Sequence, residues 1–174
     1  KTLFPYTTLF RSRRIANRMV EEAMIAANIC AGEFLAKTPG YGIFNVHPGF
    51  DAEKLPGAIE LLTAHQAPLA DESINTLDGF CQLRRWMDGL PSPFLDSRIR
   101  RFQTFSIMSP VPGPHFGLGL SAYATWTSPI RKYGDMVNHR IIKALLKGSD
   151  CPAQPSDELA QCLSDARRFN RFAE

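Results

Sequence analysis

Arg131 is the residue of this sequence whose type and position best suit it to chemistry, because it follows directly on Ser128 and Pro129. Serine is favoured at a helix N-cap and proline in the first helical turn, so the pair predicts that a helix starts here. The unpaired N–H groups of a helix start attract anions, and a guanidinium beside them can hold a phosphate by two parallel hydrogen bonds. The residues alone thus predict a phosphate-binding site around Arg131.

A plainer interpretation of the same residues stays open at this point. Arg131 and Asp135 are four positions apart and could form a surface ion pair on one helix. Such a pair contributes only about 0.3–0.5 kcal/mol to stability and requires no ligand.

The elements on either side of Arg131 must position it. Residues 121–127 are rich in aromatic and β-branched side chains, and with residues 115–120 they predict one continuous or bulged strand. Beyond Arg131, apolar residues recur at helical spacing up to Lys147, where Gly148 is a typical stop signal. This predicted inward face is made of Ile130, Tyr133, Val137, Ile141, Ala144 and Leu145.

Residues 13–37 are composed of strong helix formers and are apolar around most of the predicted helix, which indicates burial on most sides. Asn17, Glu21 and Asn28 form a narrow polar stripe along it. Two interpretations remain open for Glu21. It could pair with Arg14 or Arg18 at an exposed edge, or it could line a polar channel.

The remaining periodic segments predict further helices at residues 51–65, 76–90, 94–105 and 156–174, and a short strand at 41–46. Arginines and phenylalanines are interleaved in 94–105, which would suit a strand-binding groove. Apolar residues there also have ordinary core spacing, at Leu95, Ile99, Phe102 and Phe105, so a solvated arginine face is slightly favoured. Arg84 and Arg85 are also expected at a solvated edge. The predicted fold class is α+β and α-rich, with helices packed on a few short strands.

Composition excludes several classes of protein. The 174 residues carry a formal net charge of +3, to which Lys1 and Arg11 contribute, so the chain lacks the strong positive charge of a nonspecific nucleic-acid binder. No apolar run is long enough for a membrane span. The cysteines and histidines are scattered without zinc or redox spacing, which favours reduced thiols in a cytoplasmic protein. The cysteines are Cys30, Cys81, Cys151 and Cys162.

Residues 1–12 differ in character from the rest. They contain no acidic residue and no clear periodicity, and they lack the apolar core and cleavage site of a signal peptide. We interpret them as a foreign leader outside the fold, and residues 13–174 as one unit.

The block Thr-Ser-Pro-Ile-Arg-Lys-Tyr-Gly-Asp-Met-Val-Asn-His-Arg, residues 127–140, resembles the signature of the ribonuclease II family. The likeness extends over residues 13–174, and Gly134 and Asn138 favour ribonuclease II proper over ribonuclease R. It implies the C-terminal half of the catalytic RNB domain. The activity implied is processive 3′-to-5′ hydrolysis of single-stranded RNA to nucleoside monophosphates, assisted by Mg²⁺.

The resemblance also implies roles for individual residues. Arg131 would clamp the scissile phosphate, and Glu174 would lie near the reacting end of the RNA. Glu21 would line the RNA channel and help to distinguish RNA from DNA, which physically requires recognition of the 2′-OH. Thr127 and Ser128, which open the signature, would contact RNA.

The parts that the family needs for catalysis are expected elsewhere. Its metal-binding aspartates belong to the first half of the catalytic domain, and Asp78, Asp96 and Asp135 do not form a comparable cluster in this sequence. No metal ligand is therefore assigned here. The cold-shock and S1 RNA-binding domains are missing too. We expect this chain alone to be inactive, and a non-catalytic RNA-binding module is the alternative. A helical interaction protein without an RNA role is disfavoured by the signature.

Overall fold

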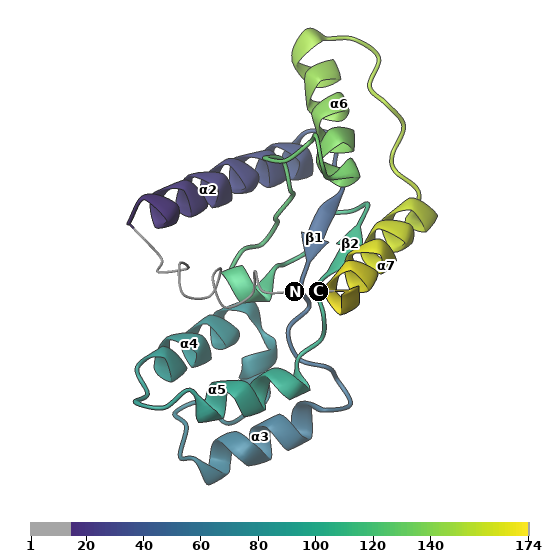
Figure 1. Cartoon of the computed structure of the whole chain (residues 1–174). Coiled ribbons are helices and arrows are strands. Elements are labelled where there is room, and N and C mark those ends of the chain that lie inside the picture. Colours follow the sequence, from purple (N-terminus) through teal and green to yellow (C-terminus); the bar gives the residue numbers. More distant parts are fainter. Residues whose placement is uncertain (1–14, 174) are drawn as a thin grey trace.

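A computed structural model describes residues 15–173 and contains, over that range, six α-helices and one two-stranded sheet (Figure 1). The elements are α2 (Ile15–Lys37), β1 (Phe44–Val46), α3 (Leu55–Ala64), α4 (Leu77–Asp88), α5 (Phe94–Ile99), β2 (Ile107–Ser109), α6 (Tyr133–Lys147) and α7 (Asp157–Ala173). The predicted α-rich α+β class is confirmed. In the described part of the chain, no helix has the length and apolar character needed to cross a membrane.

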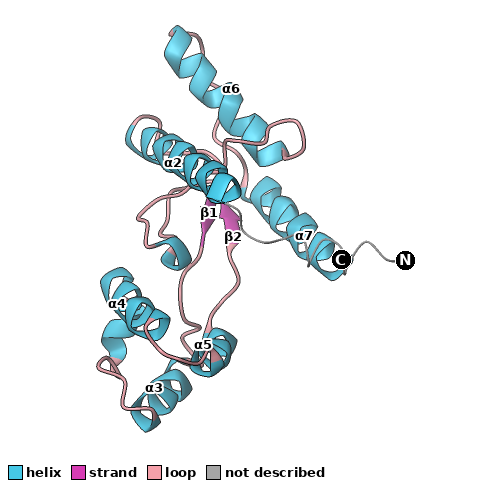
Figure 2. Ribbon diagram, turned by 60° about the vertical axis from the view of Figure 1, so that its left-hand side comes forward, coloured by secondary structure: helices cyan, strands magenta, loops and turns pink. Residues whose placement is uncertain are grey.

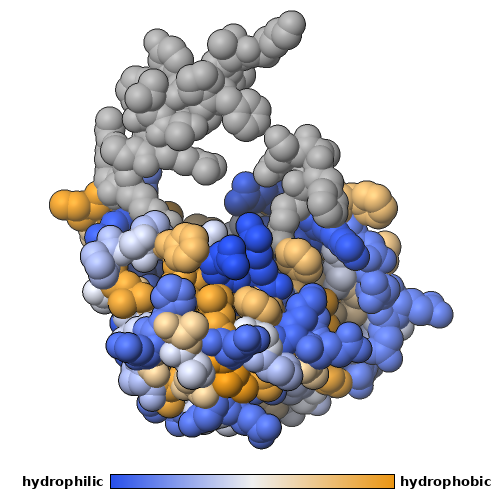
Figure 3. Space-filling model, turned by 90° about the horizontal axis from the view of Figure 1, so that it is seen from below, coloured by the Kyte–Doolittle hydropathy of each residue, from blue (hydrophilic) through white to orange (hydrophobic). Residues whose placement is uncertain are grey.

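The helices form two groups, which two neighbouring loops connect (Figure 2). At one end, α3, α4 and α5 enclose a core that includes Leu62, Phe80 and Ile99. We call this the helical end; hydrophilic and hydrophobic residues are interspersed over the face seen in Figure 3. At the other, the sheet end, α2, α6 and α7 surround β1 and β2, with Leu35 and Phe44 in a second core.

The helical end follows the sequence prediction in its three helices, most closely at α4. Thr76 caps α4 by accepting a hydrogen bond from the N–H of Gly79 at 3.1 Å. A Cβ at Gly79 would lie 2.0 Å from the carbonyl oxygen of Ser73, so only glycine fits this turn. The predicted helix 94–105 is wrong in length, because α5 ends at Ile99 and a 3₁₀ turn at residues 100–102 follows. Phe105, expected in the core, is exposed.

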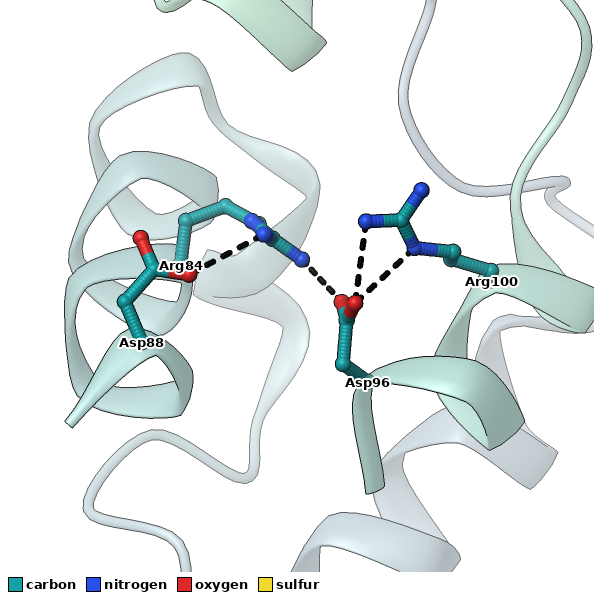
Figure 4. Close-up of polar contacts among 4 residues, drawn as sticks. All are labelled: Arg84, Asp88, Asp96 and Arg100. Atoms are coloured by element: carbon teal, nitrogen blue, oxygen red, sulfur yellow. Dashed lines mark hydrogen bonds and ion pairs between the residues drawn. The ribbon is translucent and has the colours of Figure 1, made fainter. Parts of the chain in front are cut away.

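An ion-pair network joins α4 to α5, contrary to the predicted solvated edge at Arg84 (Figure 4). Arg84 hydrogen-bonds to Asp96 and pairs with Asp88 at 3.1 Å, while Arg100 pairs with Asp96 at 2.9 Å. Desolvation alone would raise the pKa of the Asp96 carboxyl. The hydrogen bonds from Arg100 and Arg84 outweigh it, so this pKa lies below its ordinary value.

The sheet is antiparallel, with Phe44 opposite Ser109 and Val46 opposite Ile107. On the other side of β1, Ala124 forms an isolated bridge to Phe44. The predicted strand over residues 115–127 is otherwise wrong. Residues 116–118 form a 3₁₀ turn and Gly119 adopts a left-handed φ of 67°, which reverses the chain so that His115 bridges Leu120.

Helix α2 is less buried than its composition predicts. Its first half, residues 15–23, is exposed, and the buried positions begin at Asn28. Close packing occurs only toward its C-terminal end, where a Cβ at Gly32 would lie 2.9 Å from the backbone nitrogen of Ala124. The helix thus meets residues 123–124 backbone to backbone, while its first half contributes little to the core.

Helix α6 begins at Tyr133 rather than at Ser128, so the predicted cap is wrong. Residues 128–131 form a turn, in which Arg131 and Lys132 donate backbone hydrogen bonds to the Ser128 carbonyl. Lys132 then adopts extended backbone, which separates the turn from the helix. The predicted inward face shifts accordingly. Ile130 and Tyr133 are exposed, and the buried α6 residues are Gly134, Asp135, Asn138, Ile141, Ile142 and Ala144. The predicted stop is confirmed, because Gly148 has a φ of 62°.

Candidate nucleic-acid interface

The turn that carries Arg131 is closed by Asp135, in the first turn of α6. The Asp135 side chain is 1% exposed, and its Oδ2 accepts a hydrogen bond from the N–H of Ser128 at 2.8 Å. Among the described residues, no ion pair joins Asp135 to Arg131, so the surface-pair interpretation is wrong. Asp135 points inward and holds the turn, while Arg131 is exposed.

Two buried asparagines hold the segment that leads into this turn, residues 123–127. Asn138 of α6 accepts from the Ile43 N–H at 2.8 Å and donates to the carbonyls of Ile43 and Thr125, both at 2.9 Å. Asn28 of α2 donates to the Tyr123 hydroxyl and accepts from the Trp126 N–H, both at 2.8 Å. Both helices are thus tied to one extended segment.

His139 of α6 adds a third tie. Its ring stacks on Trp126 with centroids 3.6 Å apart and planes 8° from parallel. Its Nε2 lies 2.8 Å from the Trp126 carbonyl oxygen, a hydrogen-bond distance. Thr127 follows directly, so its backbone is held by α2 and α6 together.

Two cavities open around this segment. The Arg131 cavity, of about 390 Å³, is lined by Met108, Thr125, Arg131, Lys132, Tyr133, Gly134, Asp135, Leu163, Ala166 and Arg167. The Glu21 cavity, of about 400 Å³, is lined by Asn17, Val20, Glu21, Met24, Ile25, Asn28, Asn45, Tyr123, Thr125, Thr127, Lys132 and Arg167. The two cavities share Thr125, Lys132 and Arg167, so they adjoin.

The structure brings several sequence-predicted site residues together. Glu21 and Thr127, which are 106 positions apart, line one cavity, and Arg131 lines the next. Glu21 is exposed and forms no ion pair with Arg18; Arg14, its other suggested partner, lies outside the described residues. Ser128 lies in the turn that carries Arg131 and lines neither cavity. Glu174 lies outside the described residues.

Sequence reasoning missed two cations at this place, Lys132 and Arg167, which line both cavities. Lys132 could have been noticed as the neighbour of Arg131 in the signature. Arg167 carried no usable signal, because it is one of several arginines in residues 156–174. Only the packing of α7 brings it here.

The carboxylates present do not fit a magnesium site. Within residues 15–173, no group of three or more histidine, cysteine, aspartate or glutamate side chains converges as metal ligands would. Asp96 is engaged by Arg84 and Arg100 at the helical end, and Asp135 by the Ser128 N–H at the sheet end. We therefore derive no metal-dependent step from this chain.

Comparison with known proteins defines the class to which this fold belongs. The family model for the RNB domain matches residues 5–148, so the chain belongs to the RNB-domain family. The chain is 62% identical over 162 residues to "Exoribonuclease 2" of Aeromonas hydrophila subsp. hydrophila, and 59% identical over the same length to that of Escherichia coli K12. These matches cover 93% of this chain but only 24% and 25% of the relatives. The chain thus spans about a quarter of their length, and its predicted relationship is confirmed.

Solved structures share the fold. A structure of Mycoplasma genitalium RNase R in complex with ribose methylated single-stranded RNA matches with a TM-score of 0.68 and 23% identity, over 90% of this chain and 26% of that one. An active-site mutant of the Dss1 exoribonuclease from Candida glabrata matches with a TM-score of 0.57 and 27% identity, over 86% of this chain and 17% of that one. Both correspond to a small part of a longer protein.

Proposed function

We propose that residues 13–174 are the C-terminal half of the catalytic domain of a cytoplasmic 3′-to-5′ exoribonuclease, which hydrolyses single-stranded RNA to nucleoside monophosphates. The relatives of about 60% identity named Exoribonuclease 2 support this proposal. The observation that carries it is the adjoining pair of cavities, which joins Arg131 to Glu21 and Thr127. In this proposal residues 1–12 remain a foreign leader, although the match to the RNB family model begins within them, at residue 5.

Each site residue has a role in the proposed channel. Arg131, held by the turn that Asp135 closes, binds the scissile phosphate and stabilises charge that develops on it. Glu21 accepts a hydrogen bond from a ribose 2′-OH, which DNA lacks. Thr127 and Ser128 contact the RNA backbone between them, and Glu174 acts near the reacting end.

The proposed metal chemistry needs residues beyond this chain. Mg²⁺ would activate water and stabilise the phosphate when it is held by the other half of the catalytic domain. That half is also the proposed partner of the exposed part of α2, where Ile15, Met19 and Val20 present apolar side chains to solvent. The whole enzyme would also carry cold-shock and S1 domains. We expect this chain by itself to bind RNA without degrading it.

The test measures fluorescence anisotropy of a labelled single-stranded RNA against the full 174-residue chain at two salt concentrations. Arg131→Ala should weaken binding about tenfold and make it less salt-dependent, because one phosphate contact is lost. Arg140→Ala removes an exposed arginine of α6 that lines neither cavity, so it is the matched control and should bind as the unaltered chain does.

A second comparison tests the 2′-OH role. Glu21→Ala should bring the affinities for RNA and for the same DNA strand closer together, whereas Glu22→Ala, its exposed neighbour, should leave their ratio unchanged. If the unaltered chain binds no RNA, the proposal for this chain fails. If the chain releases nucleotides with added Mg²⁺, the assignment of the metal site to other parts is wrong. If this chain binds RNA and no longer form of the protein releases nucleotides from it, the alternative of a non-catalytic RNA-binding module is favoured.

A further inference from the structure

Helix α7 is attached to the edge of the sheet by a specific hydrogen bond. The Met108 N–H of β2 donates to the Ser164 hydroxyl at 2.8 Å, and that hydroxyl donates in turn to the Ala160 carbonyl at 3.0 Å. Figure 1 shows α7 lying beside β2. The helix therefore has a defined position relative to the sheet over the turn that includes Ser164.

Arg167 lies three positions beyond Ser164 and reaches across to β1. Its Nη1 donates a hydrogen bond to the Asn45 Oδ1 at 2.8 Å. Asn45 is itself buried, and its backbone N–H donates to the Tyr123 carbonyl at 2.8 Å. The planar guanidinium is thus held by a buried residue of β1 at the sheet end.

This position places Arg167 at the boundary between the two cavities. With Lys132 and Thr125 it lines both of them, while Arg131 lines only one and Glu21 only the other. A strand that extends from Arg131 to Glu21 must pass Arg167 and Lys132. Two cations at this passage suit the repeating negative charge of a nucleic-acid backbone.

We propose that Arg167 is a further RNA-binding residue, which contacts the phosphate between the nucleotide at Arg131 and the nucleotide whose ribose faces Glu21. Asn45 positions the guanidinium for that contact. This inference rests on the proposed function, because it needs RNA to occupy both cavities. It differs from a purely structural role, in which Arg167 only fastens α7 to β1.

The chain offers a matched control one position away. Arg168 lies on the same helix and carries the same charge, but it is exposed and lines neither the Arg131 cavity nor the Glu21 cavity. It borders a third cavity, beside Phe105 and Ile107, which Arg167 also lines. Arg167→Ala should weaken RNA binding about tenfold and reduce the slope of log affinity against log salt by about 0.7, the value for one single-strand phosphate contact. Arg168→Ala should change neither quantity appreciably.

Arg167→Lys separates binding from fastening. The lysine keeps the positive charge, so this variant should retain most of the slope of log affinity against log salt. It should do so even if losing the hydrogen bond to Asn45 lowers its Tm as much as Arg167→Ala lowers it. If Arg167 were only structural, both variants would weaken RNA binding equally and in proportion to their loss of Tm. That result would overturn the inference. If Arg167→Ala folds poorly, the salt slope of Arg167→Lys can still be measured.

The possible failures are distinguishable. If the unaltered chain and Arg131→Ala both fail to bind RNA, the proposed function falls and this inference with it. If the unaltered chain binds, Arg131→Ala weakens binding and Arg167→Ala binds normally with an unchanged slope, only the role of Arg167 is refuted.

Discussion

The carboxylate of Asp135 accepts a hydrogen bond from the backbone N–H of Ser128 at 2.8 Å, across seven positions of sequence. This bond closes the turn that carries Arg131 and ties it to the first turn of α6, while the extended backbone of Lys132 separates the turn from the helix. It also explains why Asp135 is buried and does not pair with Arg131, although the two lie four positions apart. The shape of the turn and the position of Arg131 in the candidate site therefore both depend on Asp135.

Asp135→Ala should leave the Ser128 N–H without its partner and loosen the turn. We expect the free energy of unfolding to fall by about 1–2 kcal/mol, with the loss of the buried carboxylate's own desolvation cost offsetting part of the effect. Urea denaturation measures this change, and RNA affinity should fall with it. Asp150→Ala removes an exposed carboxylate and should change neither. Equal stability of the two variants would contradict the role of Asp135.

Asn138→Ala should be more destabilising, because Asn138 is 0% exposed and satisfies three backbone groups of two segments. Each buried group left unpaired costs about 1–3 kcal/mol, so we expect a loss of at least about 3 kcal/mol. Thermal unfolding followed by circular dichroism is a suitable measurement. Asn75→Ala, at an exposed position, serves as the control.

Asp96→Asn should weaken the junction of α4 and α5 by about 1–2 kcal/mol, because it removes the charge to which Arg84 and Arg100 donate. Asp88→Asn should cost much less, since Asp88 is largely exposed and, among the described residues, pairs with Arg84 alone. The pKa of Asp96 is lowered on folding, so its contribution is present above pH 3.8 and is lost as the pH falls below that value. Unfolding of both variants at pH 7 and pH 3 checks each statement.

His115 should make the fold sensitive to mild acid. Burial lowers its pKa to about 4, and the neighbouring His47 and Arg167 add to that effect. The unfolded chain binds a proton at this residue below about pH 6.5, but the folded chain does so only near pH 4. Stability should therefore fall as the pH decreases from about 6.5 to about 4.

His115→Gln should reduce this acid-dependent loss of Tm by several °C between pH 7 and pH 4.5. His47, whose pKa burial also lowers, lies 5.6 Å away by ring centroids and should retain a smaller dependence of its own. His65→Gln is the control, because His65 is exposed. An unchanged pH profile in His115→Gln would show that another group causes the effect.

The sequence predicted helix ends correctly where the end depends only on residues within one helical turn. The helix predicted at 76–90 corresponds to α4, which begins after its cap Thr76, and Gly148 ends α6 as predicted, because such ends need only contacts within one turn. The start of α6 was missed for the opposite reason. Ser128 and Pro129 form a normal helix start, but here the Ser128 N–H binds Asp135 and Lys132 is extended.

The same contrast applies to the candidate site. The signature identified Arg131 and the RNB-domain relationship, since both depend on residue types in register. The strand predicted at 115–127 failed because the 3₁₀ turn at residues 116–118 and the left-handed Gly119 reverse the chain, which leaves Ala124 as a single bridge to Phe44. The burial predicted for α2 failed because its first half has no packing partner within the described residues.

By itself, the sequence determined the family and the helical content and predicted the role of Arg131, because these follow from residue types at short spacing. The tertiary structure alone decided that Glu21 and Thr127 share a cavity, that Asn28 and Asn138 hold one segment from two helices, and that Arg167 reaches Asn45 across 122 positions. Such contacts arise from how helices pack on the sheet. No local pattern encodes that packing, because it depends on the whole core.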